Sequence, residues 1–167
     1  MKEEQIVFGL GSNKGNRAEF LKKAQLLLVD EIGDFISASS VYQTAAWGFI
    51  GADFYNQVLI LNTRFSAQVC LEKGQMIEKK LGRTEKTHDQ KYADRNIDID
   101  ILFYGDQVIQ LAHLMIPHPK IKERIFVLAP LNELIPQFAH PIHQKQISEL
   151  FQECQDSSEI IKLNEQI

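Results

Sequence analysis

The chain has 167 residues, of which 44% are hydrophobic, and this size and composition suit one compact domain with a single buried core. Its 18 Lys and Arg residues against 22 Asp and Glu residues give a formal charge of −4, which argues against bulk attraction to nucleic acid or to an anionic membrane surface. Any anionic ligand would therefore be bound by a local group of cations.

The cysteines indicate neither a disulfide framework nor a zinc site. Cys70 and Cys154 lie far apart in the sequence and form no CxxC pair. No apolar run approaches the roughly 20 residues that a membrane helix needs, and the N-terminus lacks the apolar core of a signal peptide. We therefore expect a cytoplasmic monomer that is one domain over residues 1–167, with no nucleic-acid or membrane partner.

The start of the chain predicts a strand followed by a helix. Residues 6–10 form a short apolar run typical of a buried strand, and residues 11–13, Gly-Ser-Asn, predict a tight turn at its end. Asn16 is suited to cap the next helix, with Glu19 three positions later and Gly33 as its stop. Apolar residues at helical spacing give this helix one buried face: Phe20, Leu21, Ala24, Leu27 and Leu28.

The middle of the chain predicts two strands and a second helix. Residues 35–42 and 57–65 are rich in β-branched and aromatic side chains, and the loop 44–56 between them is too aromatic for a plain solvent connection. A helix is predicted over residues 66–81, ended by Gly82. Its expected core residues are Val69, Cys70, Met76, Ile77 and Leu81.

A polar stretch and the strongest strand signal follow. Residues 83–96 contain no aliphatic run and predict an exposed, mobile loop. Residues 97–101 alternate Ile and Asp strictly, which predicts a strand that continues to Tyr104. A turn at Gly105 then leads toward a partner strand over residues 107–111.

The last part of the chain completes an α+β pattern. Residues 116–119, Ile-Pro-His-Pro, are expected to be extended, because a residue before proline avoids helical geometry. A helix is predicted to begin near Arg124, and the tail after Gln144 predicts a short helix and a weak strand over 160–163. The element order favours an antiparallel-rich sheet with helices on one face, as in the split βαβ pattern of ferredoxin-like folds.

Asp98 and Asp100 are the most informative candidate site residues. Residues two apart on a strand point to the same face at a spacing of roughly 6.5 Å, so both carboxylates would share one surface. Two such carboxylates repel each other unless a cation lies between them, and Mg²⁺ prefers hard oxygen ligands and takes the rest from water and phosphates. The alternative is a strand whose polar face is simply solvated.

Basic residues next to this strand suit a phosphate ligand. Arg83, Lys86 and Arg95 lie in the polar stretch that leads to Asp98, where they are able to converge on phosphates held by the aspartates. The alternative is that they are ordinary loop charges, and for Lys86 alone this reading is preferred. His118, between two prolines, is held rigidly enough to aim an imidazole N–H at a phosphate, although a histidine packed in a turn is more common.

An aromatic set is suited to bind a flat heterocycle. Trp47, Phe54 and Phe126 could stack on both faces of a bicyclic base, and Asn56 offers a donor and an acceptor on one side chain. Thr44 could add backbone contacts. The alternative is that these rings belong to the core, which is the preferred reading for Phe126 on spacing alone.

Together these segments resemble the 6-hydroxymethyl-7,8-dihydropterin pyrophosphokinase family of folate synthesis. The resemblance covers most of the chain. It implies a ferredoxin-like α/β sandwich as the fold of this chain. It is carried by five ordered blocks: residues 10–13 (Leu-Gly-Ser-Asn), 42–44 (Tyr-Gln-Thr) with Asn56, 78–83 (Glu-Lys-Lys-Leu-Gly-Arg), 95–102 (Arg-Asn-Ile-Asp-Ile-Asp-Ile-Leu), and 117–119 (Pro-His-Pro) followed by 123–128 (Glu-Arg-Ile-Phe-Val-Leu).

The resemblance also implies an activity and a role for each matching residue. The family transfers the diphosphate of ATP to the pterin hydroxymethyl group and releases AMP, with two Mg²⁺ ions bound by Asp98 and Asp100. Arg83 and Arg95 match phosphate-contacting, catalytic arginines. The implied pterin-binding residues are Thr44, Ala45, Trp47, Phe54, Asn56, Asp98 and Phe126. The implied ATP-binding residues are Gln75, Glu78, Arg83, Lys86, Arg95, Ile101, His118 and Arg124.

One departure from the family pattern keeps other functions open. Residues 92–95 are Tyr-Ala-Asp-Arg where the family commonly has Trp-Gly-Pro-Arg. The chain could therefore be a catalytically silent module that binds nucleotide or pterin, or a magnesium-dependent nucleotide transferase with another acceptor.

Overall fold

The computed structural model describes residues 2–46, 50–82 and 96–164. Runs of strands are separated by helices along the chain, in an α+β order. The elements are β1 (Glu4–Ser12), α1 (Arg17–Glu31), β2 (Gly33–Ala38), β3 (Tyr42–Thr44), β4 (Phe54–Thr63), α2 (Ala67–Lys80), β5 (Asp98–Tyr104), β6 (Ile109–Leu111), β7 (Leu114–Ile116), the 3₁₀ turn η1 (Ile121–Glu123), α3 (Ile125–Leu134), α4 (Ile147–Glu153) and β8 (Ile160–Lys162). No helix in these ranges is long and apolar enough to cross a membrane.

The main sheet is antiparallel throughout. Its strand order is β5-β1-β4-β3-β8, and β2 also pairs with β4. The segment after β5 does not join this sheet as predicted. Instead β6 pairs with β7 in a separate two-stranded sheet.

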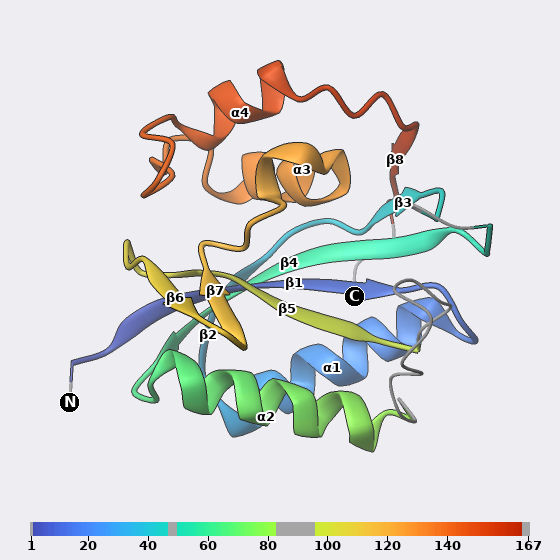
Figure 1. The fold of residues 1–167 in the computed structure, drawn as a ribbon. Helices are drawn as coiled ribbons and strands as arrows, with labels where there is room; N and C mark the ends of the chain where they lie inside the picture. The colour runs from blue at the N-terminus through green and yellow to red at the C-terminus, as the bar shows by residue number, and fades with distance from the viewer. Residues whose placement is uncertain (1, 47–49, 83–95, 165–167) are drawn as a thin grey trace.

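Helices cover both faces of the sheet (Figure 1). The helices α1 and α2 lie on one face, whereas α3 and α4 lie on the other. The predicted α/β sandwich is confirmed, but the prediction of helices on one face is wrong. The physical reason is visible in β1, where Ile6 and Phe8 point to the first face and Val7 points to the second, so both faces are apolar and need cover.

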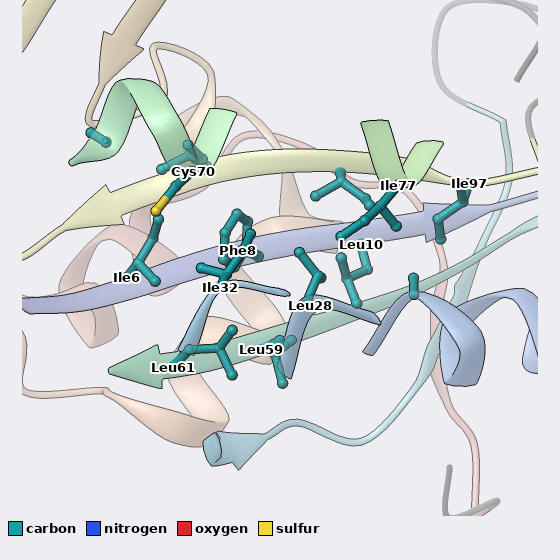
Figure 2. Close-up of a cluster of buried hydrophobic side chains, with 14 of the residues drawn as sticks. Ile6, Phe8, Leu10, Leu28, Ile32, Leu59, Leu61, Cys70, Ile77 and Ile97 are labelled. Atoms are coloured by element: carbon teal, nitrogen blue, oxygen red, sulfur yellow. The ribbon is translucent and has the colours of Figure 1, made fainter. Parts of the chain in front are cut away.

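The core is accordingly split into two clusters. The first joins Phe8 and Leu10 of β1 to Leu28 of α1 and Ile77 of α2 (Figure 2). The second packs apolar residues from the opposite face of the strands against α3 and α4. The sheet is therefore packed against helices on both of its faces.

The predicted Asn16 cap is confirmed, and α2 has a cap that was not predicted. The Asn16 side chain accepts a hydrogen bond from the Glu19 amide at 3.1 Å, and Ser66 caps α2 at the Val69 amide at 3.3 Å. One predicted core residue of α2 is wrong, since Met76 is 58% exposed. The buried side of α2 follows Cys70, Gly74, Ile77 and Glu78, and Met76 lies off that line.

Three strand boundaries differ from the prediction. Residues 35–42 are not one strand, because the Ser39 hydroxyl accepts a hydrogen bond from the Val58 amide at 2.9 Å and takes the place of a ladder partner between β2 and β3. The strand β4 begins at Phe54, so part of the predicted aromatic loop is sheet. The strand β1 continues through Gly11 to Ser12, where a turn was expected.

Candidate active site

The strands β1 and β5 place two glycines beside the two aspartates. Asp98 is directly opposite Gly11, and Asp100 is directly opposite Gly9. Opposite residues of an antiparallel pair point to the same face, so the carboxylates stand next to positions without side chains. The sheet therefore forms a floor with open space above it, and the predicted shared face of Asp98 and Asp100 is confirmed by the strand geometry.

A first cavity of about 220 Å³ opens above this floor. It is bounded by β1, β4 and β5, by the end of β3, and by the start of α3. Every described residue of the expected pterin set lines it: Thr44, Ala45, Phe54, Asn56, Asp98 and Phe126. Segments distant in the sequence thus meet in one hollow that is partly apolar.

Hydrogen bonds fix the orientation of Asn56 in the first cavity. Its Nδ2 donates to the Tyr42 carbonyl oxygen at 3.1 Å and to the Thr44 hydroxyl at 2.9 Å. The Oδ1 atom faces the position where a Cβ on Gly11 would lie, 3.6 Å away. The amide donor expected to bind a ligand is therefore used within the protein, which leaves the acceptor toward the cavity.

A second cavity of about 640 Å³ lies between α2, β5 and the β6–β7 hairpin. Four residues of the expected nucleotide set line it: Gln75, Glu78, Ile101 and His118. Glu78 is buried, and its Oε1 accepts a hydrogen bond from the Ile99 amide at 2.8 Å. Because Ile99 separates the two aspartates, Glu78 anchors the strand segment that carries them.

Three side chains line both cavities, namely Asp98, Asp100 and His118. The His118 Nδ1 accepts a hydrogen bond from the Lys120 amide at 3.1 Å, which places the ring proton of a neutral imidazole on Nε2. Burial, followed by the charge of Arg124, lowers the pKa of His118 to about 4, although Asp98 acts in the opposite direction. At neutral pH His118 is thus an N–H donor without charge.

Arg124, which the resemblance places among the ATP-binding residues, lines the first cavity. Its guanidinium carbon is 5.6 Å from the centre of the Phe126 ring. Both residues belong to the start of α3, where Arg124 is the N-cap residue. The lining of the first cavity thus includes one positive charge from the start of α3.

The donor set at β5 suits a hard divalent cation. Asp98 and Asp100 supply carboxylate oxygens from one strand, and water and phosphate oxygens are the ligands with which Mg²⁺ completes its shell. Within residues 2–46, 50–82 and 96–164, no three His, Cys, Asp or Glu side chains group closely enough to hold a metal by themselves. The residues therefore fit a metal that shares its ligands with a bound phosphate.

Several predicted residues lie outside the described ranges: Trp47, Arg83, Lys86 and Arg95. The departure at residues 92–94 does too.

Sequence reasoning missed two groups that line the cavities. Gly9 and Gly11 form the floor of the first cavity, and residues 112–115 line the second. The alternate spacing of the two glycines on an apolar strand was an available signal, because glycine inside a strand often marks a close approach by a ligand.

Comparisons with known proteins give a consistent result. The family model for 7,8-dihydro-6-hydroxymethylpterin-pyrophosphokinase (HPPK) matches residues 7–136. The 2-amino-4-hydroxy-6-hydroxymethyldihydropteridine pyrophosphokinase of Aquifex aeolicus is 39% identical over 145 residues, which cover 86% of this chain and 88% of the relative. The Porphyromonas gingivalis protein of the same name is 38% identical over 138 residues, covering 81% and 93%.

Solved structures share the fold. The crystal structure of Plasmodium falciparum HPPK-DHPS wild type with pteroate matches 91% of this chain with a TM-score of 0.73 and 18% identity. The match covers 42% of that longer chain, so this protein spans less than half of its length.

Proposed function

This chain belongs to the HPPK family, and on that premise we propose that it transfers the diphosphate of ATP to the hydroxymethyl group of 6-hydroxymethyl-7,8-dihydropterin. AMP is the second product, and the reaction is a step of folate synthesis. The observation that carries the proposal is the meeting of two unlike cavities at Asp98, Asp100 and His118. Nothing in the comparisons favours a silent module.

The first cavity is the proposed pterin site. Two aromatic rings line it, and Phe54 and Phe126 are the proposed stacking partners of the flat pterin bicycle. The Asn56 Oδ1 is oriented by two donated hydrogen bonds from its own amide group and is able to accept one from a pterin N–H. Thr44 and Ala45 would contact the edge of the ring, and Trp47 is proposed for the same group on the resemblance alone.

The second cavity is the proposed ATP site. It is larger than the first, which suits a nucleotide with its polyphosphate. Gln75, Glu78 and Ile101 line it, and the His118 Nε2–H is positioned at the junction to donate to a phosphate oxygen. Arg83, Lys86 and Arg95 are proposed as phosphate ligands on the resemblance.

We propose that Asp98 and Asp100 hold two Mg²⁺ ions at the junction. When bound, such ions neutralise phosphate charge and stabilise the attacking and leaving oxygens of an in-line displacement. Glu78 serves this site indirectly, because its hydrogen bond to the Ile99 amide fixes the strand between the two aspartates.

The reaction has a simple balance. The pterin hydroxymethyl oxygen forms a bond to the β-phosphorus of ATP, and the bond from that phosphorus to the bridging oxygen of the α-phosphate breaks. AMP leaves with the electron pair, and either Asp98 or solvent takes the hydroxyl proton. The protein acts mainly by positioning two substrates at adjoining cavities and excluding water between them.

The test is AMP release from ATP by the wild-type protein, with and without 6-hydroxymethyl-7,8-dihydropterin, in Mg²⁺ and again after chelation. AMP that needs both the pterin and the metal, with pterin diphosphate in equal amount, is the expected result. AMP formed equally without the pterin would mean hydrolysis and would contradict the transfer. Full turnover after chelation would contradict the metal role alone.

A further inference from the structure

The segment after α4 contacts two walls of the first cavity. We name residues 155–164 the C-terminal strap; it follows the part of the chain that the family model matches. It leaves α4, runs past α3 and ends beside β3 (Figure 1). Its contacts fall at two places that matter for the proposed pterin site.

The first contact is with the start of α3. The Asp156 Oδ2 accepts a hydrogen bond from the Ile125 amide at 3.0 Å. Ile125 lies between Arg124 and Phe126, both of which line the first cavity. The N-cap residue of this helix is an arginine, whose side chain has no acceptor for an amide hydrogen, so the strap supplies the cap from a distance.

Asp156 is itself held in place. Its Oδ1 accepts hydrogen bonds from the amide and the hydroxyl of Ser158. Burial favours the neutral acid, but these hydrogen bonds and the one from Ile125 outweigh it, and the pKa of Asp156 is lowered. The group facing the helix start is therefore a fixed carboxylate, which is the charge that a helix N-terminus favours.

The second contact is with β3, which ends at Thr44. The strand β8 pairs with β3 through Tyr42↔Lys162, Gln43↔Ile161 and Thr44↔Ile160. The Leu163 amide also donates to the Val41 carbonyl oxygen at 2.8 Å. Since β3 has 3 residues, it would be a short edge strand if β8 were absent.

A third link joins the opposite ends of the same two elements, namely the end of α3 and the beginning of β3. On α3, the Glu133 carboxylate accepts hydrogen bonds from the Ser40 amide and hydroxyl and from the Tyr42 hydroxyl, at 2.7 to 3.2 Å. Lys162 of the strap lies 3.9 Å from the same carboxylate. The elements α3 and β3 and the strap are thus joined to one another beside the first cavity.

We propose that the C-terminal strap positions the pterin site, with Asp156 and Ile161 as positioning residues that set the separation between Phe126 on α3 and Thr44 on β3. The inference rests on the proposed function, because it takes the first cavity to be the pterin site. The hydrogen bond from Ile125 and the strand pairing with β3 both act on elements that line the first cavity, so we expect a larger effect on pterin than on ATP.

The experiment measures pterin and ATP affinity separately in four variants. Asp156→Ala removes the cap, Asp156→Asn keeps an acceptor, Ile161→Pro disrupts the pairing with β3, and Glu159→Ala removes an exposed carboxylate of the same strap as the control. Pterin affinity is measured by calorimetry with saturating Mg²⁺ and α,β-methylene ATP, which lacks the scissile bond. ATP affinity, KM, kcat and thermal midpoint are measured in parallel.

We expect the Kd and KM for pterin to rise about fivefold in Asp156→Ala and in Ile161→Pro, with ATP affinity within about twofold of wild type. Asp156→Asn should recover most of the loss, and Glu159→Ala should match wild type. Unchanged pterin affinity in both disruptive variants would overturn the proposal. So would a parallel loss of pterin and ATP affinity that follows the fall in thermal midpoint, because that is a structural role alone. Wild-type protein that does not bind pterin would instead contradict the proposed function.

Discussion

The first and second cavities share strand β5 but are built in different ways. The first is enclosed mainly by strands of the main sheet and the start of α3, and its polar side chains Asn56 and Thr44 are buried and hydrogen-bonded to each other. The second lies between α2, the edge strand and the β6–β7 hairpin, and it is lined partly by exposed side chains such as Gln75 and Lys79.

This difference suits two kinds of recognition. Buried side chains with fixed hydrogen bonds discriminate strongly, because a wrong ligand leaves those groups unpaired. Exposed polar side chains tolerate a large charged ligand whose contacts remain solvated. Mutations at the residues shared by both cavities should therefore weaken binding of both ligands, whereas a mutation in one cavity should weaken binding of the ligand in that cavity only.

The largest effect is expected at the shared aspartates. Asp98→Asn or Asp100→Asn should lower AMP release by about 1,000-fold or more, because each removes a charged ligand of the proposed metal site. The control is Asp106→Asn, an exposed acid in the turn after β5. Turnover within tenfold of wild type in either variant, by a coupled AMP assay, would contradict the shared site.

The next effect separates the cavities. In Gly11→Val the added methyl groups enter the first cavity, and pterin affinity should fall about 100-fold while ATP affinity is retained. Gly11→Ala is the graded control, since its Cβ would make ordinary contacts at 3.5 Å with Phe54 and 3.6 Å with Asn56. Calorimetry with each ligand measures the two affinities. Equal losses of affinity for both ligands would contradict the assignment of one ligand to each cavity.

A smaller effect concerns pH. His118, which lines both cavities, and His140 both have a pKa lowered to about 4, in each case chiefly by burial. The unfolded chain binds protons near pH 6.5 and the native state does not, so stability is complete above that pH and is lost as the pH falls toward 4. The free energy of unfolding should therefore fall by about 1 to 2 kcal/mol for each histidine between pH 7 and pH 5.

Urea unfolding at several pH values tests this expectation. His118→Gln and His140→Gln should each reduce the fall in unfolding free energy between pH 7 and pH 5. His113→Gln, at an exposed histidine, is the matched control. A slope that is the same in all three variants would show that neither buried ring is responsible. If the fall in unfolding free energy is reduced only in His140→Gln, His118 does not contribute to the acid sensitivity of the fold.

The smallest effect is expected at the rim of the second cavity. Lys79→Ala removes an exposed cation and should raise the Kd of ATP only about two- to threefold, an effect that added salt reduces. Pterin affinity should not change. Lys22→Ala, on the exposed side of α1, is the control, and a larger loss for pterin than for ATP would reverse the assignment of the cavities.

Much of the site could be predicted because the residues carry their geometry locally. The alternation at residues 97–101 places both carboxylates on one face of any strand, and the capping residue Asn16 sets a helix start through a contact three positions away. By contrast, no local pattern shows that Asn56 gives its amide donor to Tyr42 and Thr44, since that depends on the pairing of β3 with β4.

The sequence alone therefore determined the helices, most of the strands, the aspartate pair and the resemblance to the HPPK family, because these follow from local periodicity and short motifs. The tertiary structure decided what depends on strand order and packing: the cover of both faces of the sheet, the placement of Gly9 and Gly11 opposite the aspartates, and Arg124 at the first cavity. It also brought Asp156 to the start of α3. Such contacts join residues that are distant in the chain, and a single sequence carries no local signal for them.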